Sequence, residues 1–245
     1  MGLRLLNHEE AAEYSRFLES YHPSGQVVFD FARSNFGIIA GPTGAGKDTI
    51  RQRLIQMSPD IYRPILSTTT RPPRPGEQDG VDYHYRDLKF FEEGLDERRF
   101  LQAEVVMNQQ ISGLDFGDIA SLDSMHYGLG ILVVQAEKRL RELNSKLKTM
   151  FIVPPSYQEW INRIQSSRSM KEDEIMRRMT SAKGEIEFAL KDDSYYLLTN
   201  DNLDITTRLA NRFFQAGERD SSAVQLAKIA MQQILNELST YKINE

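Results

Sequence analysis

A glycine-rich segment that ends in a lysine has the residue types and spacing to bind phosphate groups. The segment reads Gly41, Pro42, Thr43, Gly44, Ala45, Gly46, Lys47. It follows an apolar stretch at 37–40 that we expect to be a strand, and a helix is expected from Lys47 to about residue 56. In this context, main-chain N–H groups bind phosphate oxygens and the lysine neutralises charge that moves during phosphoryl transfer. A glycine-rich turn without a ligand is the alternative.

The position after the lysine departs from this motif. Serine or threonine is expected there as a Mg²⁺ ligand, but the chain has Asp48, followed by Thr49. A carboxylate is a good hard ligand for Mg²⁺, yet it adds negative charge beside phosphates. Alternatively, Asp48 only favours the positive end of the helix. Asp48 is therefore a candidate Mg²⁺ ligand, with both interpretations open.

A second segment, 67–83, combines hydroxyl groups, prolines and two arginines. Arg71 and Arg74 lie three residues apart among prolines and could present guanidinium forks to one phosphate. A solvated proline-rich loop with stray charges is the alternative. Because 62–94 lacks long periodic runs, we expect a substrate loop or insert there, without a core element.

Composition describes an ordinary globular chain. Its 245 residues, 40% hydrophobic and 27% charged, suit one α/β domain with helical extensions. The absence of cysteine excludes disulfides and thiolate metal sites and favours a reducing compartment. A net charge of -5 argues against nonspecific nucleic-acid binding, and no apolar run is long enough for a membrane span. We therefore expect a cytoplasmic protein with no nucleic-acid or membrane partner.

The elements that must position these residues alternate along the chain. Strands are expected at 37–40, 100–106, 130–134, 149–153 and 195–198, and helices at 137–148, 160–189 (with a polar break at 166–169) and 221–241. Such alternation is typical of a parallel sheet with helical crossovers. Asn7 and Glu10 form a capping-box pattern at the start of a further amphipathic helix. Both terminal helices are expected to pack on the core.

Taken together, these segments closely resemble the guanylate kinase family over about 36–214. Besides the two loops, the matching positions are Phe151, Ile152, Pro154, Pro155, Ser156, Arg177, Arg178, Ala182, Glu185, Asn200, Asp201, Leu203 and Asp204. The resemblance implies an α/β P-loop NTPase fold, a parallel sheet flanked by helices, with an insert that binds the nucleoside monophosphate and a helical lid. It implies an N-terminal helical extension at 1–30, a guanylate kinase-like domain at 31–215 (insert about 63–112, lid about 160–190) and a C-terminal helix at 216–245.

The resemblance also implies roles for single side chains. Those matching the acceptor-phosphate clamp are Ser67, Arg71, Arg74, Glu77 and Tyr83. Those matching lid arginines, which stabilise the phosphoryl group in flight together with Lys47, are Arg178, Arg163 and, one place from its expected position, Arg168. For the last two, i,i+4 salt bridges on a charged helix are the alternative. Asn200 matches a contact to the adenine of ATP.

Three departures from the family pattern affect specificity and metal binding. Gln102 replaces the acid that reads guanine, although Glu104 returns to the same strand face and could take over. Amides, with Gln110 as the candidate contact, replace a pair of tyrosines. The stretch 131–134 lacks the family's acids, and only Glu137 lies near it.

The resulting hypothesis is an Mg²⁺-dependent nucleoside monophosphate kinase that converts ATP and GMP to ADP and GDP in purine nucleotide metabolism. Its partners would be small nucleotide substrates, and the chain would be a monomer or homodimer. Two alternatives remain. Ribose bisphosphate kinases similar to guanylate kinase also carry Asp after the loop lysine, and guanylate kinase-like scaffold modules bind without catalysis.

Overall fold

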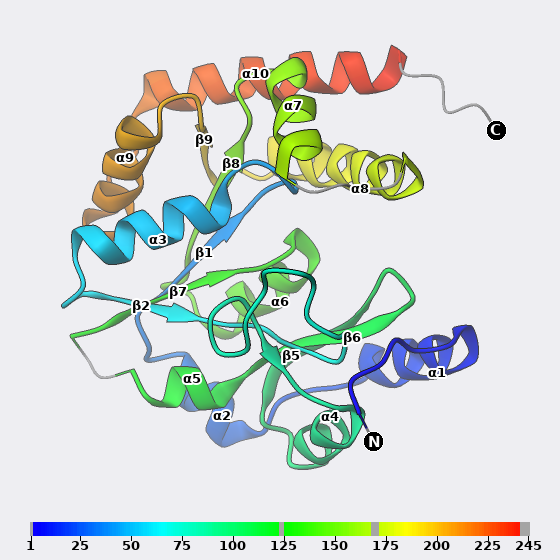
Figure 1. Cartoon of the computed structure of the whole chain (residues 1–245). Helices are drawn as coiled ribbons and strands as arrows, with labels where there is room; N and C mark the ends of the chain where they lie inside the picture. Colours follow the sequence, from blue (N-terminus) through cyan, green and yellow to red (C-terminus); the bar gives the residue numbers. More distant parts are fainter. Residues whose placement is uncertain (1, 123–124, 168–171, 241–245) are drawn as a thin grey trace. The chain divides into compact units, whose positions relative to one another are not determined.

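The computed structural model describes residues 2–122, 125–167 and 172–240 (Figure 1). The chain forms two compact units. The P-loop unit comprises Gly37–Tyr62 and Lys148–Glu245, and the insert unit comprises Met1–Phe36 and Arg63–Leu147. The mixed α/β architecture expected from the sequence is confirmed.

Parallel strands form the centre of the P-loop unit. They are β1 (Phe36–Ala40), β8 (Lys148–Val153) and β9 (Tyr196–Thr199), with β8 in the middle. Ile39 aligns with Met150, and Phe151 aligns with Leu197. Their nearly continuous apolar residues are buried, as is typical of parallel strands covered on both faces. The three strands expected here are confirmed to within one residue at each end.

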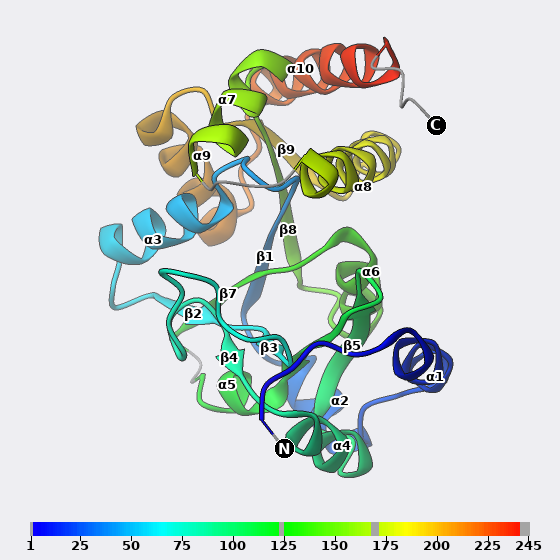
Figure 2. The ribbon, with the colours of Figure 1, turned by 45° about the vertical axis from the view of Figure 1, so that its right-hand side comes forward.

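Helices α3 (Lys47–Met57), α7 (Tyr157–Ser167), α8 (Glu172–Leu190), α9 (Leu203–Ala216) and α10 (Ser221–Thr240) complete this unit. The C-terminal helix α10 packs on β9, β8 and α8 (Figure 2). Its buried side chains include Ala227, Met231 and Ile234. The expectation that this helix packs on the core is confirmed. Helix α9, which was not predicted from the sequence, packs against α3.

A four-stranded sheet in the order β4-β3-β6-β5 forms the insert unit. The strands are β3 (Thr68–Thr69), β4 (His84–Tyr85), β5 (Phe100–Val106) and β6 (Gln110–Asp115). Strand β2 (Tyr62–Ile65) and helix α4 (Leu88–Asp96) also lie in the stretch expected to lack core elements. That expectation was wrong, because two-residue strands are too short for a periodic signal, while α4 buries Phe91 and Leu95.

The rest of the insert unit comprises α1 (His8–Glu19), α2 (Gly25–Phe31), α5 (Phe116–Ala120), β7 (Tyr127–Ile131) and α6 (Val134–Leu143). The expected strand at 130–134 therefore ends early, and the helix expected at 137–148 is shifted toward the N-terminus. Asn144 ends this helix with an extended backbone, and its side chain donates to the carbonyls of Phe31 and Ser34. The expected capping box is confirmed, with reciprocal bonds of 2.9 Å between Asn7 and Glu10.

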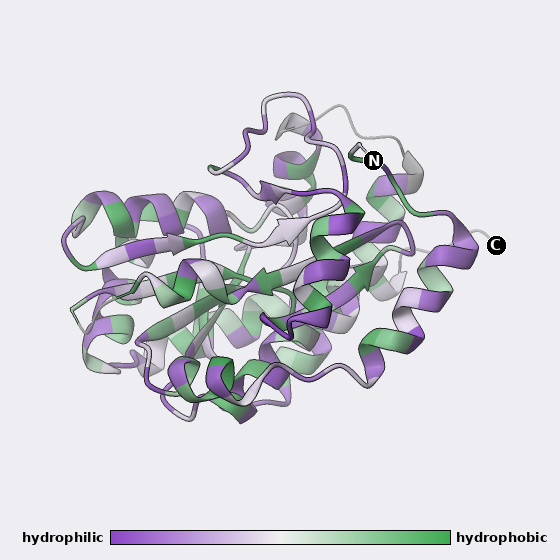
Figure 3. Ribbon diagram, turned by 90° about the horizontal axis from the view of Figure 1, so that it is seen from below, coloured by the Kyte–Doolittle hydropathy of each residue, from purple (hydrophilic) through white to green (hydrophobic). Residues whose placement is uncertain are grey.

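Helices α1 and α4 cover one face of the four-stranded sheet. The shared core is formed by Leu6, Ala11, Leu18, Phe91, Leu95, Phe100, Ala103 and Ile111. In Figure 3 many helices carry both hydrophobic and hydrophilic residues along their length, as expected for elements with one apolar face. The packing expected of the N-terminal helix is thus confirmed. Within the described ranges, no helix has the length and apolar character needed to cross a membrane.

Candidate functional site

The glycine-rich loop connects β1 to α3, which is the predicted context. Gly41, Gly44 and Gly46 have φ values of 134°, 83° and 92°, in the region that favours glycine. A Cβ on Gly41 would also overlap the main-chain oxygen of Ile152. Gly46 caps α3 without a side-chain hydrogen bond, so the first N–H groups of the helix are not capped by a side chain. This geometry suits the binding of phosphate oxygens at a helix N-terminus.

Lys47 folds back over the loop from the first position of α3. Its Nζ donates to the carbonyl oxygens of Gly41 at 2.6 Å and Pro42 at 3.0 Å. Burial lowers the pKa of Lys47, while the carboxylates of Glu185 and Asp48 act in the opposite direction. An anion near the loop would therefore offset an unfavourable environment for this ammonium group.

Helices α7 and α8 both contact the loop at Thr43. The indole Nε1 of Trp160 on α7 donates to the Thr43 carbonyl at 2.7 Å, and Nη1 of Arg178 on α8 donates to the Thr43 Oγ1 at 2.9 Å. Arg178 is held by Glu174, whose Oε1 lies 2.6 Å from Nη2. The predicted Arg178 therefore lies at the loop. Trp160 was missed, because an aromatic residue on an amphipathic helix is usually explained by core packing.

Arg163 and Asn200 of the P-loop unit contact each other. Arg163 donates to Glu159 through Nε at 2.8 Å and to the Asn200 carbonyl through Nη2 at 3.0 Å. The i,i+4 pair offered as an alternative is thus present, together with a main-chain contact. Asn200 is buried, and its amide donates to the Ala45 carbonyl at 2.9 Å. Its contact to adenine stays a prediction, and Arg168 lies outside the described residues.

Asp48 and Thr49 lie in the first turn of α3, and both are exposed. The Asp48 side chain is 72% exposed, and its Oδ1 lies 3.4 Å from Nη2 of Arg51. Nowhere in the part of the chain that the structure describes do three His, Cys, Asp or Glu side chains gather to hold a metal ion. A metal at Asp48 would therefore need further oxygen ligands from phosphates or water.

In the insert unit, the predicted clamp centres on Glu77. This carboxylate accepts from Arg71 at 2.6 and 3.1 Å, from the Arg74 main-chain N–H at 2.8 Å and from the Tyr85 hydroxyl at 2.8 Å. Burial alone would raise the pKa of Glu77, but these donors outweigh it and lower the pKa to about 2. Tyr85 was not predicted, since it lies in a two-residue strand.

The Arg71 guanidinium is fixed on several sides. It lies over the rings of Tyr83 and Tyr85, 4.9 and 5.4 Å from their centroids. Its Nη1 also donates to the Pro72 carbonyl at 3.0 Å. The Nη1–Nη2 fork that was expected to face a phosphate is thus bound to Glu77, so a ligand would meet the Nε edge. The structure brings Arg71, Glu77 and Tyr83 together, as predicted.

Strand register places three of the predicted acceptor residues, Gln102, Glu104 and Gln110, on one face of the sheet. Glu104 is opposite Ser112, Ser112 opposite Thr69, and Thr69 opposite Tyr85, forming a row across all four strands. Residues opposite each other point to the same face, as do residues two apart. Gln102 therefore shares this face with Glu104, and Ala103 on the opposite face packs with the α1 and α4 core. Gln110 also reaches this row, because its Nε2 donates to Thr69 Oγ1 at 3.3 Å.

The chain is similar to known guanylate kinases in sequence and in fold. The guanylate kinase family model matches residues 33–216. The guanylate kinase of Corynebacterium jeikeium is 31% identical over 169 residues, covering 68% of this chain and 88% of that protein. The guanylate kinase of Streptomyces kasugaensis is 30% identical, covering 78% and 93%.

Among solved structures, the guanylate kinase from Anaplasma phagocytophilum matches with a TM-score of 0.58 at 19% identity. The match covers 78% of this chain and 88% of that one, and it shows the shared P-loop NTPase fold. On the extent of the family match and the identity to its members, this chain belongs to the guanylate kinase family.

Proposed function

We propose that this protein transfers the γ-phosphoryl group of ATP to GMP, giving ADP and GDP. Guanylate kinases are ATP-dependent phosphotransferases that use Mg²⁺. The observation that carries the proposal is the presence, in one chain of this family, of a phosphate loop ending at Lys47 and a buried Arg71–Glu77 clamp. The first suits a triphosphate donor, and the second suits a phosphorylated acceptor.

On the donor side, loop N–H groups and the N-terminus of α3 bind the phosphates of ATP. Lys47 exchanges its carbonyl partners for phosphate oxygens, and this restores a favourable environment for its charge. Arg178, held by Glu174 at Thr43, stabilises the charge on the phosphoryl group in flight, with Arg163 in support. The Asn200 amide supports the loop through its bond to the Ala45 carbonyl, and Asn200 contacts the adenine.

The residues at the start of α3 fit Mg²⁺. The exposed carboxylate of Asp48 is a hard oxygen ligand, and phosphate oxygens and water would complete the coordination. Bound there, Mg²⁺ would neutralise charge on the phosphates. Thr49 is the second oxygen donor in this turn.

On the acceptor side, the N–H groups of Arg71 that remain outside the Glu77 pair bind the GMP phosphate. Ser67, Arg74 and Tyr83 complete that phosphate site, while Gln110 lies nearby on the same sheet. A phosphate oxygen of GMP attacks the γ-phosphorus of ATP, and the bond to the β–γ bridging oxygen breaks. ADP leaves with that oxygen. Alignment and electrostatic stabilisation supply the catalysis, without a covalent enzyme intermediate.

Steady-state turnover with ATP and a panel of acceptors tests this function. GMP is expected to be phosphorylated faster than dGMP, AMP, UMP or a ribose bisphosphate, and Lys47→Ala should abolish turnover, whereas Lys228→Ala, on the outer helix α10, should not. Turnover of the ribose bisphosphate alone would support the second candidate, which Asp48 after the loop lysine and Gln102 at the base-reading position both favour. No turnover with any acceptor would support a binding module.

A further inference from the structure

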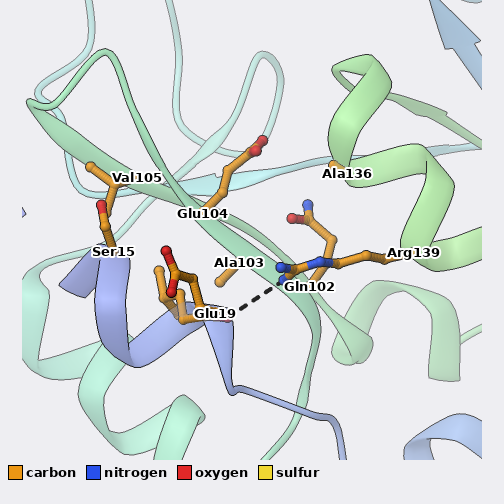
Figure 4. Close-up of a pocket in the computed structure, with 9 residues that line it drawn as sticks. Ser15, Glu19, Gln102, Ala103, Glu104, Val105, Ala136 and Arg139 are labelled. Atoms are coloured by element: carbon orange, nitrogen blue, oxygen red, sulfur yellow. Dashed lines mark hydrogen bonds between the residues drawn. The ribbon is translucent and has the colours of Figure 1, made fainter.

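Glu104 lies in a pocket that the N-terminal helix helps to build. The pocket has a volume of about 230 Å³ and lies along the edge strand β5, between α1 and α6 (Figure 4). Its lining includes Ser15 and Glu19 from α1, Gln102 and Glu104 from β5, and Arg139 from α6. The matched family model begins at residue 33, so the α1 wall lies outside the matched region.

Within this pocket, Gln102 and Glu104 extend to the same side of β5 (Figure 4), as their register with Leu114 and Ser112 requires. Gln102 is 4% exposed. Its amide offers one acceptor and one donor group, whereas an ionised carboxylate offers two acceptor oxygens. Glu104 is thus the better match on this strand for a ligand edge that carries two adjacent N–H donors.

The same sheet face connects Glu104 to the phosphate clamp. The row from Glu104 through Ser112 to Thr69 spans two strand spacings, about 10 Å at ~4.8 Å per spacing. Tyr85, at the far end of the row, donates to Glu77 in the clamp. The Glu104 carboxylate therefore lies at one end of the row, and the proposed phosphate clamp lies at the other end. This arrangement suits a nucleotide whose base binds at Glu104 and whose phosphate binds at the clamp.

We propose that Glu104, rather than Gln102, binds the adjacent N1–H and N2–H donors of the guanine base, so that base reading is displaced by two residues along β5. The inference rests on the proposed function, whose acceptor specificity it explains. If Glu104 binds the base, position 102 does not need the acid that the family carries there, and Gln102 can replace it.

The electrostatic surroundings of Glu104 are consistent with a carboxylate that a ligand's hydrogen-bond donors would stabilise. Burial raises the pKa of Glu104 to about 7, and the positive charge of Arg139 acts against this rise. Glu19 of α1 also faces the pocket. Among the described residues, no side chain or main-chain donor bonds to the Glu104 carboxylate. Two N–H groups of a guanine base would favour its charged form.

The experiment compares GMP with IMP, which lacks the 2-amino group. Glu104→Gln should lower kcat/KM for GMP by about 10- to 100-fold, as expected for one unmatched buried donor, and change that for IMP by only a few-fold. The exposed Glu93→Gln on α4 is the matched control and should change neither value. Equal values for Glu104→Gln and unmodified protein would overturn the inference while the proposed function stands. An unmodified protein that does not turn over GMP would overturn both.

A second variant keeps the test decisive if Glu104→Gln does not fold. Gln102→Glu places another carboxylate on the same face, where repulsion disfavours ionisation of Glu104. If Glu104 reads the base, this variant should lower kcat/KM for GMP or leave it unchanged. An increase in kcat/KM for GMP, with IMP unaffected, would assign the reading to position 102 and overturn the inference.

Discussion

Arg71 and Glu77 form a buried ion pair, with Nη1 and Oε2 2.6 Å apart and each side chain 7% exposed. Removing one partner from such a pair leaves a buried charge without compensation. The pair also fixes the guanidinium that we assign to the acceptor phosphate. Stability and acceptor binding should therefore fall together when Glu77 is replaced.

Glu77→Ala is expected to lower the free energy of unfolding by about 3 to 5 kcal/mol, because Arg71 stays buried. The Michaelis constant for GMP should rise as well. Urea denaturation measures the first effect and steady-state kinetics the second. Glu93→Ala is the control, since it removes the exposed pair with Lys89, 3.6 Å apart, and should cost less than about 1 kcal/mol. If both variants lost a similar free energy of unfolding, the Arg71–Glu77 pair would contribute no more to stability than an exposed ion pair.

Glu104 should make stability depend on pH in the direction opposite to Glu77. Its pKa is raised from 4.5 to about 7 on folding, so the folded state keeps a proton that the unfolded state loses between these values. The contribution of Glu104 to the free energy of unfolding is therefore fully present below pH 4.5. It is lost as the pH rises through 7, by up to about 3 kcal/mol. Glu77, with its pKa lowered to about 2, loses its contribution as pH falls from 4.5 toward 2.

The measurement is the free energy of unfolding of unmodified protein and Glu104→Gln at pH 5 and pH 8. The free energy of unfolding of the variant minus that of the unmodified protein should be more positive at pH 8 than at pH 5. The same difference at both pH values would show that Glu104 titrates normally. A functional site that costs stability is a common compromise where ionisable groups are buried for binding.

Arg178 on α8 bonds directly to the phosphate loop, so it offers a test of catalysis. Arg178→Lys keeps a positive charge but cannot bond both Thr43 and Glu174 through a planar fork. We expect kcat to fall about 10²- to 10³-fold, as for the loss of one stabilising donor, with a much smaller change in ATP affinity. Arg208→Lys, exposed on α9, is the control. If ATP affinity falls as far as kcat, Arg178 serves ground-state binding instead.

Particular residues show how far the sequence alone could lead. The glycine positions and Lys47 lie as the motif predicts, and alternation along a strand correctly placed Gln102 and Glu104 on one face. Tyr85 and Trp160 were not found, because their roles depend on contacts with residues 8 and 117 positions away. The bond of Arg71 to Glu77 in place of a free fork is likewise set by tertiary packing, which no local pattern encodes.

Asp48 is the residue at the start of α3 through which Mg²⁺ binding can be tested. Its carboxylate is mostly exposed and lies 3.4 Å from Arg51, so removing it should disturb little of the fold. Asp48→Ala is expected to raise the Mg²⁺ concentration needed for half-maximal turnover by about tenfold or more, while ATP affinity measured without Mg²⁺ changes little. Asp60→Ala, exposed in the turn between α3 and β2, is the control. Asp48→Ser should recover part of the Mg²⁺ response, because a hydroxyl is the ligand that this motif usually supplies. Equal losses of Mg²⁺ response and ATP affinity, or no loss of either, would show that Asp48 only complements the positive end of the helix.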